Sequence, residues 1–249
     1  MLRFLWFCCL LGSSGLIGAQ DASIPREQAI LVHVSYGAHL SQGDLSERFG
    51  LSLSPELSVE WLNDQNTVLA GLQGAFFFGN QVEEDVLAPL RTRDGGIIGN
   101  DRSFADLLLR QRGFFLGAHL GKIFTFGQQT ARSGLRISVG GGFFQHRIRI
   151  QEDPSRNVPQ LDPPYRAGYD RLTNGPALRQ AIGFQMLSAD GRINVKVTLV
   201  ALQAFTQNRR PFNFDTRTAD RTRRLDAQFG IRASWTLPFY LQDGSGIFY

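Results

Sequence analysis

The feature that most constrains this chain is a strict alternation of apolar and polar side chains, which recurs along most of its 249 residues. Between Leu51 and Trp61, every odd-numbered position is apolar or proline, and every even-numbered position is serine or glutamate. Successive side chains of a β-strand point to opposite faces, so a period of two predicts strands with one apolar and one polar face. The chain is therefore predicted to be all-β.

Eight segments carry this pattern, and an even number of strands suits an up-and-down antiparallel barrel. Segments of about 11 to 15 residues exceed the usual length of strands in soluble sheets, but they suit strands tilted through a bilayer. The predicted strands span residues 30–40, 51–61, 67–80, 113–126, 134–150, 177–188, 194–207 and 225–239.

The connections between these segments alternate in length. Those after the second, fourth and sixth strands are short, whereas 81–112, 151–176 and 208–224 are long. The connections 151–176 and 208–224 mix prolines with aromatic residues, so we expect them to be ordered. Short periplasmic turns opposite longer outer loops are typical of bacterial outer-membrane barrels. We predict an eight-stranded antiparallel up-and-down transmembrane β-barrel with ordered outer loops and periplasmic termini.

The alternation leaves open which face points inward. A soluble ligand-binding barrel would place its apolar face inside and would cover its surface with lysine, yet this chain has two lysines, Lys122 and Lys196. Its polar face instead combines small residues with charges of both signs, as a narrow lumen requires. An eight-stranded lumen is filled by side chains, so a diffusion pore is not expected. The predicted lumen charges are Glu56, Glu60, Arg136, Arg179, Lys196, Asp226 and Arg232.

The N-terminus has the layout of a secretory signal peptide. Arg3 precedes a mostly apolar run over residues 4–17, and small residues follow at Gly18 and Ala19. We expect residues 1–19 to be removed and residues 20–249 to form one barrel domain. Both cysteines lie inside the apolar run, which argues against a lipid anchor. Residues after 20 contain no apolar run long enough for a membrane-spanning helix.

The expected binding surface lies in the outer loops. The chain has 26 Lys+Arg against 22 Asp+Glu, a net charge of +4, and its arginines gather toward the long connections. Arginine matches phosphate and carboxylate groups, so this rim would bind a partner protein or lipopolysaccharide; the alternative is internal pairing with loop aspartates. No nucleic-acid partner is expected at this location. The candidate residues are Arg147, Arg149, Tyr169, Arg171, Arg209, Arg210, Phe212 and Phe214.

The four histidines do not suggest a metal or cofactor site. His33 and His39 share one strand face but are about 20 Å apart, too far to share a metal ion. Lumen histidines are expected to be hydrogen-bonding partners. His146, close to Glu152 and Asp153, leaves open a lipid-modifying enzyme that uses this histidine at the barrel rim. No spacing places a serine beside it, so we assign no catalytic residue and expect a non-enzymatic function.

Six segments carry a resemblance to a known group: Gly43-Asp44-Leu45, Arg48-Phe49-Gly50, Phe78-Gly79-Asn80, 142–150, 168–175 and 206–215. At these residues the chain resembles small outer-membrane β-barrel proteins of the Bacteroidota. This resemblance covers most of the chain after the signal peptide and implies the fold and an outer-membrane location. Proteins of this group have no assigned activity, so it implies no catalytic residue. Bacteria of this phylum also carry accessory barrels in outer-membrane assembly and secretion complexes, so a role as a complex subunit is open.

Overall fold

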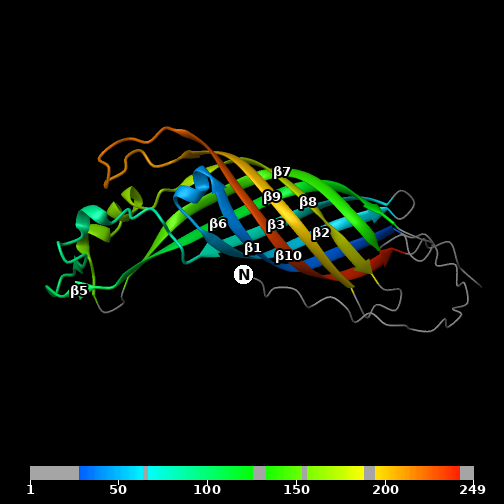
Figure 1. Cartoon of the computed structure of the whole chain (residues 1–249), viewed down its shortest axis with the longest axis horizontal. Helices are drawn as coiled ribbons and strands as arrows, with labels where there is room; N and C mark the ends of the chain where they lie inside the picture. The colour runs from blue at the N-terminus through cyan, green and yellow to red at the C-terminus, as the bar shows by residue number, and fades with distance from the viewer. Residues whose placement is uncertain (1–27, 64–66, 126–132, 153–155, 188–193, 242–249) are drawn as a thin grey trace, which may run out of the picture.

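The computed structural model describes residues 28–63, 67–125, 133–152, 156–187 and 194–241, which form a closed eight-stranded antiparallel barrel (Figure 1). Each strand pairs with its neighbours along the chain, and the first and last strands close the barrel, so the predicted up-and-down topology is confirmed. No helix in this described part is long and apolar enough to cross a bilayer. The barrel strands are β1 (Gln28–Gly43), β2 (Leu51–Asn63), β3 (Val68–Gly79), β6 (Leu107–Phe124), β7 (Gly134–Glu152), β8 (Thr173–Leu187), β9 (Asn194–Asn208) and β10 (Arg223–Leu241).

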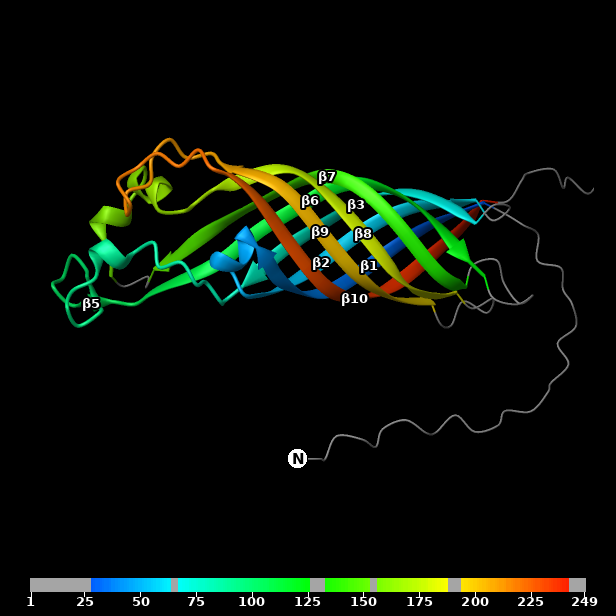
Figure 2. The ribbon, with the colours of Figure 1, turned by 45° about the horizontal axis from the view of Figure 1, so that its top comes forward.

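The long connections gather at one end of the barrel, which we call the loop end (Figures 1 and 2). They span residues 80–106, 153–172 and 209–222. The shorter connection 44–50 lies at the same end of the barrel. The alternation did not predict their local structure, because these elements are short and held by tertiary contacts. They contain the hairpin β4 (Ile97–Ile98) and β5 (Phe104–Ala105), and the 3-10 helices η1 (Asp44–Glu47), η2 (Ala88–Leu90), η3 (Pro159–Leu161) and η4 (Tyr165–Gly168).

Several strands are longer at the loop end than the sequence predicted. β6 begins at Leu107 rather than at residue 113, and β8 begins at Thr173 rather than at residue 177. The outward positions of this part of β6 include Arg110 and Arg112, so the apolar alternation fades although the strand continues. Part of each predicted loop is therefore strand, and the β6–β7 hairpin carries charge on its outer face.

The polarity of the barrel is that of a transmembrane barrel, with its apolar face outward. Leu72, Leu116 and Trp235 are 60–66% exposed on the outside, whereas the inward-facing Glu60 and Lys196 are no more than 2% exposed. The predicted orientation is confirmed. The opposite arrangement, which the soluble ligand-binding alternative requires, is not the one adopted.

Glu60 organises the charged layer of the lumen nearer the termini. It binds His33 at 2.8 Å and His119 at 3.0 Å through their Nε2 atoms. Arg136 Nη2 lies 2.7 Å and Lys196 Nζ 3.6 Å from the carboxylate. One carboxylate on β2 thus connects β1, β6, β7 and β9 across the barrel, and the lumen histidines are hydrogen-bonding partners, as predicted.

Glu56 organises a second layer closer to the loop end. It accepts hydrogen bonds from Arg179 at 2.7 and 2.8 Å and from Arg232 at 2.7 Å. The Arg179 guanidinium also lies 5.4 Å from the centre of the Phe115 ring. Ion pairs therefore cross the lumen from β2 to β8 and β10. All the predicted lumen charges are buried: Glu56, Glu60, Arg136, Arg179, Lys196, Asp226 and Arg232.

Buried apolar clusters flank these charged layers on both sides. The cluster at the end opposite the loops comprises Ala29, Leu31, Leu62, Leu69, Ile123 and Leu187. The cluster at the loop end is larger and includes Leu45, Phe49, Phe77, Phe115, Phe144 and Ile148. Side chains therefore fill the lumen along its length, as expected for eight strands.

Candidate binding surface at the loop end

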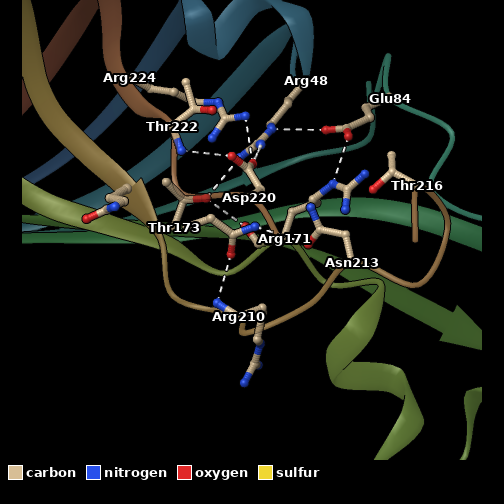
Figure 3. Close-up of polar contacts among 12 residues, drawn as sticks. Arg48, Glu84, Arg171, Thr173, Arg210, Asn213, Thr216, Asp220, Thr222 and Arg224 are labelled. Atoms are coloured by element: carbon tan, nitrogen blue, oxygen red, sulfur yellow. Dashed lines mark hydrogen bonds and ion pairs between the residues drawn. The ribbon is translucent and has the colours of Figure 1, made fainter. Parts of the chain in front are cut away.

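Ion pairs cross-link the connections of the loop end (Figure 3). Arg171 donates from Nε to Glu84 Oε1 at 2.8 Å and from Nη2 to Asp215 Oδ2 at 2.5 Å. Its side chain is only 3% exposed. Because Glu84 and Asp215 belong to the connections 80–106 and 209–222, one guanidinium holds the three long connections together.

Arg48 extends this network to the connection 44–50. Its Nε lies 2.9 Å from Glu84 Oε2, and its Nη1 donates to Thr173 Oγ1 at 2.9 Å. Asp220 lies 3.9 Å from Arg48 Nη2 (Figure 3). All four connections at the loop end are thus joined, and we call this ion-paired assembly the cap.

Asp220 is held in its ionised form by hydrogen-bond donors that follow it closely in the sequence. Arg224 Nη2 and the Thr222 backbone N–H donate to its carboxylate at 2.8 and 3.0 Å. Burial raises the pKa of Asp220, but these hydrogen bonds outweigh burial and hold the pKa at about 2. The carboxylate therefore stays charged at neutral pH.

Three exposed aromatic side chains of the connections 153–172 and 209–222 have neighbouring rings, and we call them the aromatic surface: Tyr165, Phe212 and Phe214. Their exposed fractions are 56%, 41% and 38%. The Phe214 ring centre lies 6.5 Å from that of Tyr165, 6.0 Å from that of Phe212 and 5.6 Å from that of the buried Tyr169. The buried Tyr169 ring thus packs against Phe214 of this surface.

The remaining predicted loop arginines differ in their partners. Arg210 donates from Nε to Asp170 Oδ1 at 2.7 Å, and this hydrogen bond raises the pKa of Arg210. Arg209 is exposed, and its Nε donates to Asn174 Oδ1 at 2.6 Å. Internal pairing, left open by the sequence, is therefore the arrangement of Arg171 and Arg210.

Arg147 and Arg149 lie apart from the cap network, on the outer face of β7. Both are exposed, and each is directly opposite another arginine on β6: Arg147 pairs in register with Arg112, and Arg149 with Arg110. We call these four side chains the wall arginines. The eight predicted residues therefore separate into the cap with its aromatic surface and a second, purely basic surface on the barrel wall.

Sequence reasoning missed three members of these surfaces. Tyr165 lies in the predicted loop 151–176 but is not among the candidate residues, and Arg110 and Arg112 lie in the segment 81–112, which was predicted as loop. Arg110, Arg112 and Phe114 share one parity, so extending the β6 alternation by a few residues would have placed both arginines on the outer face.

His146 lies inside the barrel. It is 1% exposed, its Nε2 is 2.8 Å from Asp226 Oδ2, and its ring contacts those of Phe49 and Phe144 at centre distances of 5.5 Å. Glu152, the acid expected near it, pairs with Arg166 instead. Asp153 lies outside the described residues. The rim arrangement that the enzyme alternative needs is therefore not formed by His146 and Glu152.

The known proteins that resemble this chain do so in fold. The sequence matches no protein-family model and no curated protein. Among solved structures, Neisserial surface protein A aligns with a TM-score of 0.44 at 11% identity, covering 85% of this chain and 99% of that protein. The attachment invasion locus protein of Yersinia pestis aligns with a TM-score of 0.39 at 10% identity, with the same coverage of both chains. A second structure of that protein, with the heparin analogue sucrose octasulfate, has a TM-score of 0.39 at 9% identity.

Proposed function

We propose that this chain is a non-enzymatic, non-conducting integral outer-membrane barrel whose loop end binds a partner protein. The membrane location is supported by the inverted polarity, because dozens of exposed apolar side chains surround a lumen of buried ion pairs. Such an exterior is stable in lipid and unfavourable in water. The filled lumen argues against passage of solutes, so the loop end is the part of the molecule available for recognition.

The observation that carries the partner-binding proposal is the aromatic surface on an ion-paired cap. Exposed aromatic residues and arginine are the types that protein interfaces concentrate at their centres. Because Arg171 and Arg48 already fix the connections, the surface loses little conformational freedom on binding. Tyr165, Phe212, Phe214 and the exposed Arg209 would supply the contacts.

The proposal includes the topology in the envelope. Residues 1–19 would be removed as a signal peptide, the barrel domain of residues 20–249 would place both termini in the periplasm, and the loop end would face outward. With such a partner the chain would act as a subunit of an outer-membrane assembly or secretion complex, a role that the sequence resemblance leaves open.

The test is the native mass of the tagged protein after extraction from envelopes in mild detergent. We expect a particle larger than the barrel in its micelle, containing a companion protein in fixed stoichiometry. The double variant Tyr165→Ser with Phe212→Ser should release that companion. A matched control is Ile98→Ser with Phe104→Ser, which removes two side chains of about 50% exposure from the connection 80–106.

Three results would contradict the proposal. If the wild-type extract contains only the barrel, partner binding is contradicted. If both double variants lose the companion equally, the aromatic surface is not its binding site. Extraction of the wild-type protein without detergent would remove the membrane location itself.

A further inference from the structure

The wall arginines form a basic surface without acidic partners in the described part of the chain. The register of β6 and β7 places Arg110 opposite Arg149 and Arg112 opposite Arg147. Cα atoms of directly opposed residues in an antiparallel pair lie about 4.5 to 5.5 Å apart, so the four guanidinium groups share one small area. Figure 1 shows β6 and β7 as long neighbouring strands that extend toward the loop end.

Ion pairs with carboxylates involve other arginines nearby. Glu152, next to this surface on β7, is bound by Arg166, and Asp170 is bound by Arg210. Arg112 donates from Nη1 to the backbone oxygen of Gln111 at 2.7 Å, which does not neutralise its charge. Like charges directly opposite on a sheet are destabilising, so this arrangement calls for an anion from outside the chain.

The position of the wall arginines relative to the apolar exterior indicates the source of that anion. On the same outer face, Phe114 follows Arg112 by two residues, about 7 Å along the strand. The ring centres of Phe114 and Phe143 lie 6.1 Å apart, and both side chains are about 40% exposed. Aromatic side chains at this level mark the boundary between hydrocarbon and headgroups. The arginines thus lie where lipid headgroups begin.

An open depression of about 490 Å³ adjoins this surface. Its lining includes Arg147 and Arg149 on β7, together with Arg156 and Arg166 from the connection 153–172. Two carboxylates, Glu152 and Asp170, line it as well, and each is bound by an arginine, Arg166 or Arg210. Arginine forks bind phosphate oxygens in pairs, and a phosphate monoester carries a charge of about −1.5 to −2 at neutral pH. Two such groups on one lipid would neutralise most of the charge of four arginines.

We propose that Arg110, Arg112, Arg147 and Arg149 bind the phosphate groups of a phosphorylated glycolipid of the outer leaflet. This inference rests on the proposed outer-membrane location and identifies the lipid chemistry that the barrel wall recognises. The lipid would lie with its acyl chains against the apolar exterior, its phosphates on the wall arginines and its sugars toward the depression.

The test is native mass spectrometry of the full chain in nonionic micelles, titrated with bis-phosphorylated lipid A. We expect saturable binding of the lipid by the wild-type protein and at least about tenfold weaker binding by the double variant Arg147→Gln with Arg149→Gln, because charge-assisted hydrogen bonds are lost. The matched control is Arg217→Gln with Arg221→Gln, which removes two exposed arginines from the connection 209–222 and should bind like the wild type. Resistance of the unheated barrel to detergent denaturation verifies folding of each variant.

Two further probes identify the source of the phosphate. Dephosphorylated lipid A should bind at least about tenfold more weakly, and inorganic phosphate in excess should not displace the phosphorylated lipid. Equal binding of both lipids, displacement by free phosphate, or equal loss in the control variant would overturn the inference. Failure of the wild-type protein to enter micelles at all would instead overturn the proposed membrane location, so the two failures are distinguishable.

Discussion

The arginines of the lumen and the cap differ from those of the barrel wall in the anion that each one faces. Arg179 and Arg232 in the lumen, and Arg171 in the cap, each lie within 2.8 Å of a carboxylate oxygen of the same chain. Arg110 and Arg149 on the wall lie opposite each other instead. The contrast shows that these buried arginines have counter-charges within the chain, whereas the wall arginines have none in the described residues.

The physical reason is the cost of desolvation. A charge removed from water loses several kcal/mol of hydration, and only a close counter-charge with good hydrogen-bond geometry offsets the loss. A guanidinium at a water-exposed headgroup layer keeps part of its hydration and meets mobile anions. If this account is correct, removing a lumen anion should lower the free energy of unfolding strongly. Breaking an ion pair of the cap should destabilise the protein less. Removing wall arginines should cause no loss of stability in the absence of lipid.

The largest effect is expected from Glu60→Gln. The substitution keeps the shape of the side chain but removes the negative charge that Arg136 and Lys196 share. Breaking a buried ion-paired cluster from one side typically costs about 3–5 kcal/mol, so the free energy of unfolding in micelles should fall by about that amount. Urea titration followed by tryptophan fluorescence measures it.

Glu83→Gln is the matched control, because Glu83 is an exposed glutamate in the connection 80–106. It should change the free energy of unfolding by less than about 0.5 kcal/mol. Equal effects of the two substitutions would mean that the lumen charges are hydrated and that the comparison drawn above does not hold.

A smaller, pH-dependent effect is expected in the cap. The folded pKa of Asp220 is about 2, below the ordinary value of 3.8, so its ion pair stabilises the cap fully above about pH 4. This contribution is lost as the pH falls from about 4 to about 2. Hydrogen exchange, corrected for its intrinsic pH dependence, should report it at the amides of Arg209 and Asn213, which donate to Leu172 and Thr218.

We expect protection of these amides to fall about 3- to 10-fold across that range, less than the full pKa shift implies because solvent screens the pair. Asp220→Asn should lower protection at neutral pH and remove most of the change between pH 4 and pH 2. An unchanged acid profile in this variant would assign the loss of protection to other carboxylates of the cap.

The lumen was more predictable from sequence than the cap, for a geometric reason. In a barrel the inward face is set by a period of two, so Glu56 and Arg179 could be placed in the lumen without knowing which residues they contact. The cap has no such period. Arg171 and Glu84 are 87 residues apart in the chain, and nothing local to either residue indicates that they meet.

The wall arginines fall between these cases. Arg147 and Arg149 were predicted as binding residues, yet their partners on β6 were not, because prediction of the strand stopped where its outward residues ceased to be apolar. A charged outward position in a transmembrane barrel marks the level at which the hydrocarbon ends, and the hydrogen-bonded strand continues past that level. Under the proposed membrane location, the loss of alternation at Arg110 and Arg112 marks the boundary of the membrane rather than the end of the strand.

The smallest effect on the free energy of unfolding is expected for the wall arginines. In nonionic micelles without phosphorylated lipid, Arg147→Gln with Arg149→Gln removes like charges that lie opposite Arg112 and Arg110. The free energy of unfolding should therefore stay constant or rise by up to about 1 kcal/mol. Bis-phosphorylated lipid A should reverse the order, because it stabilises only the protein that binds it. A fall in the free energy of unfolding without lipid would show that the wall arginines already have stabilising partners within the protein, and the distinction between wall and lumen would be lost.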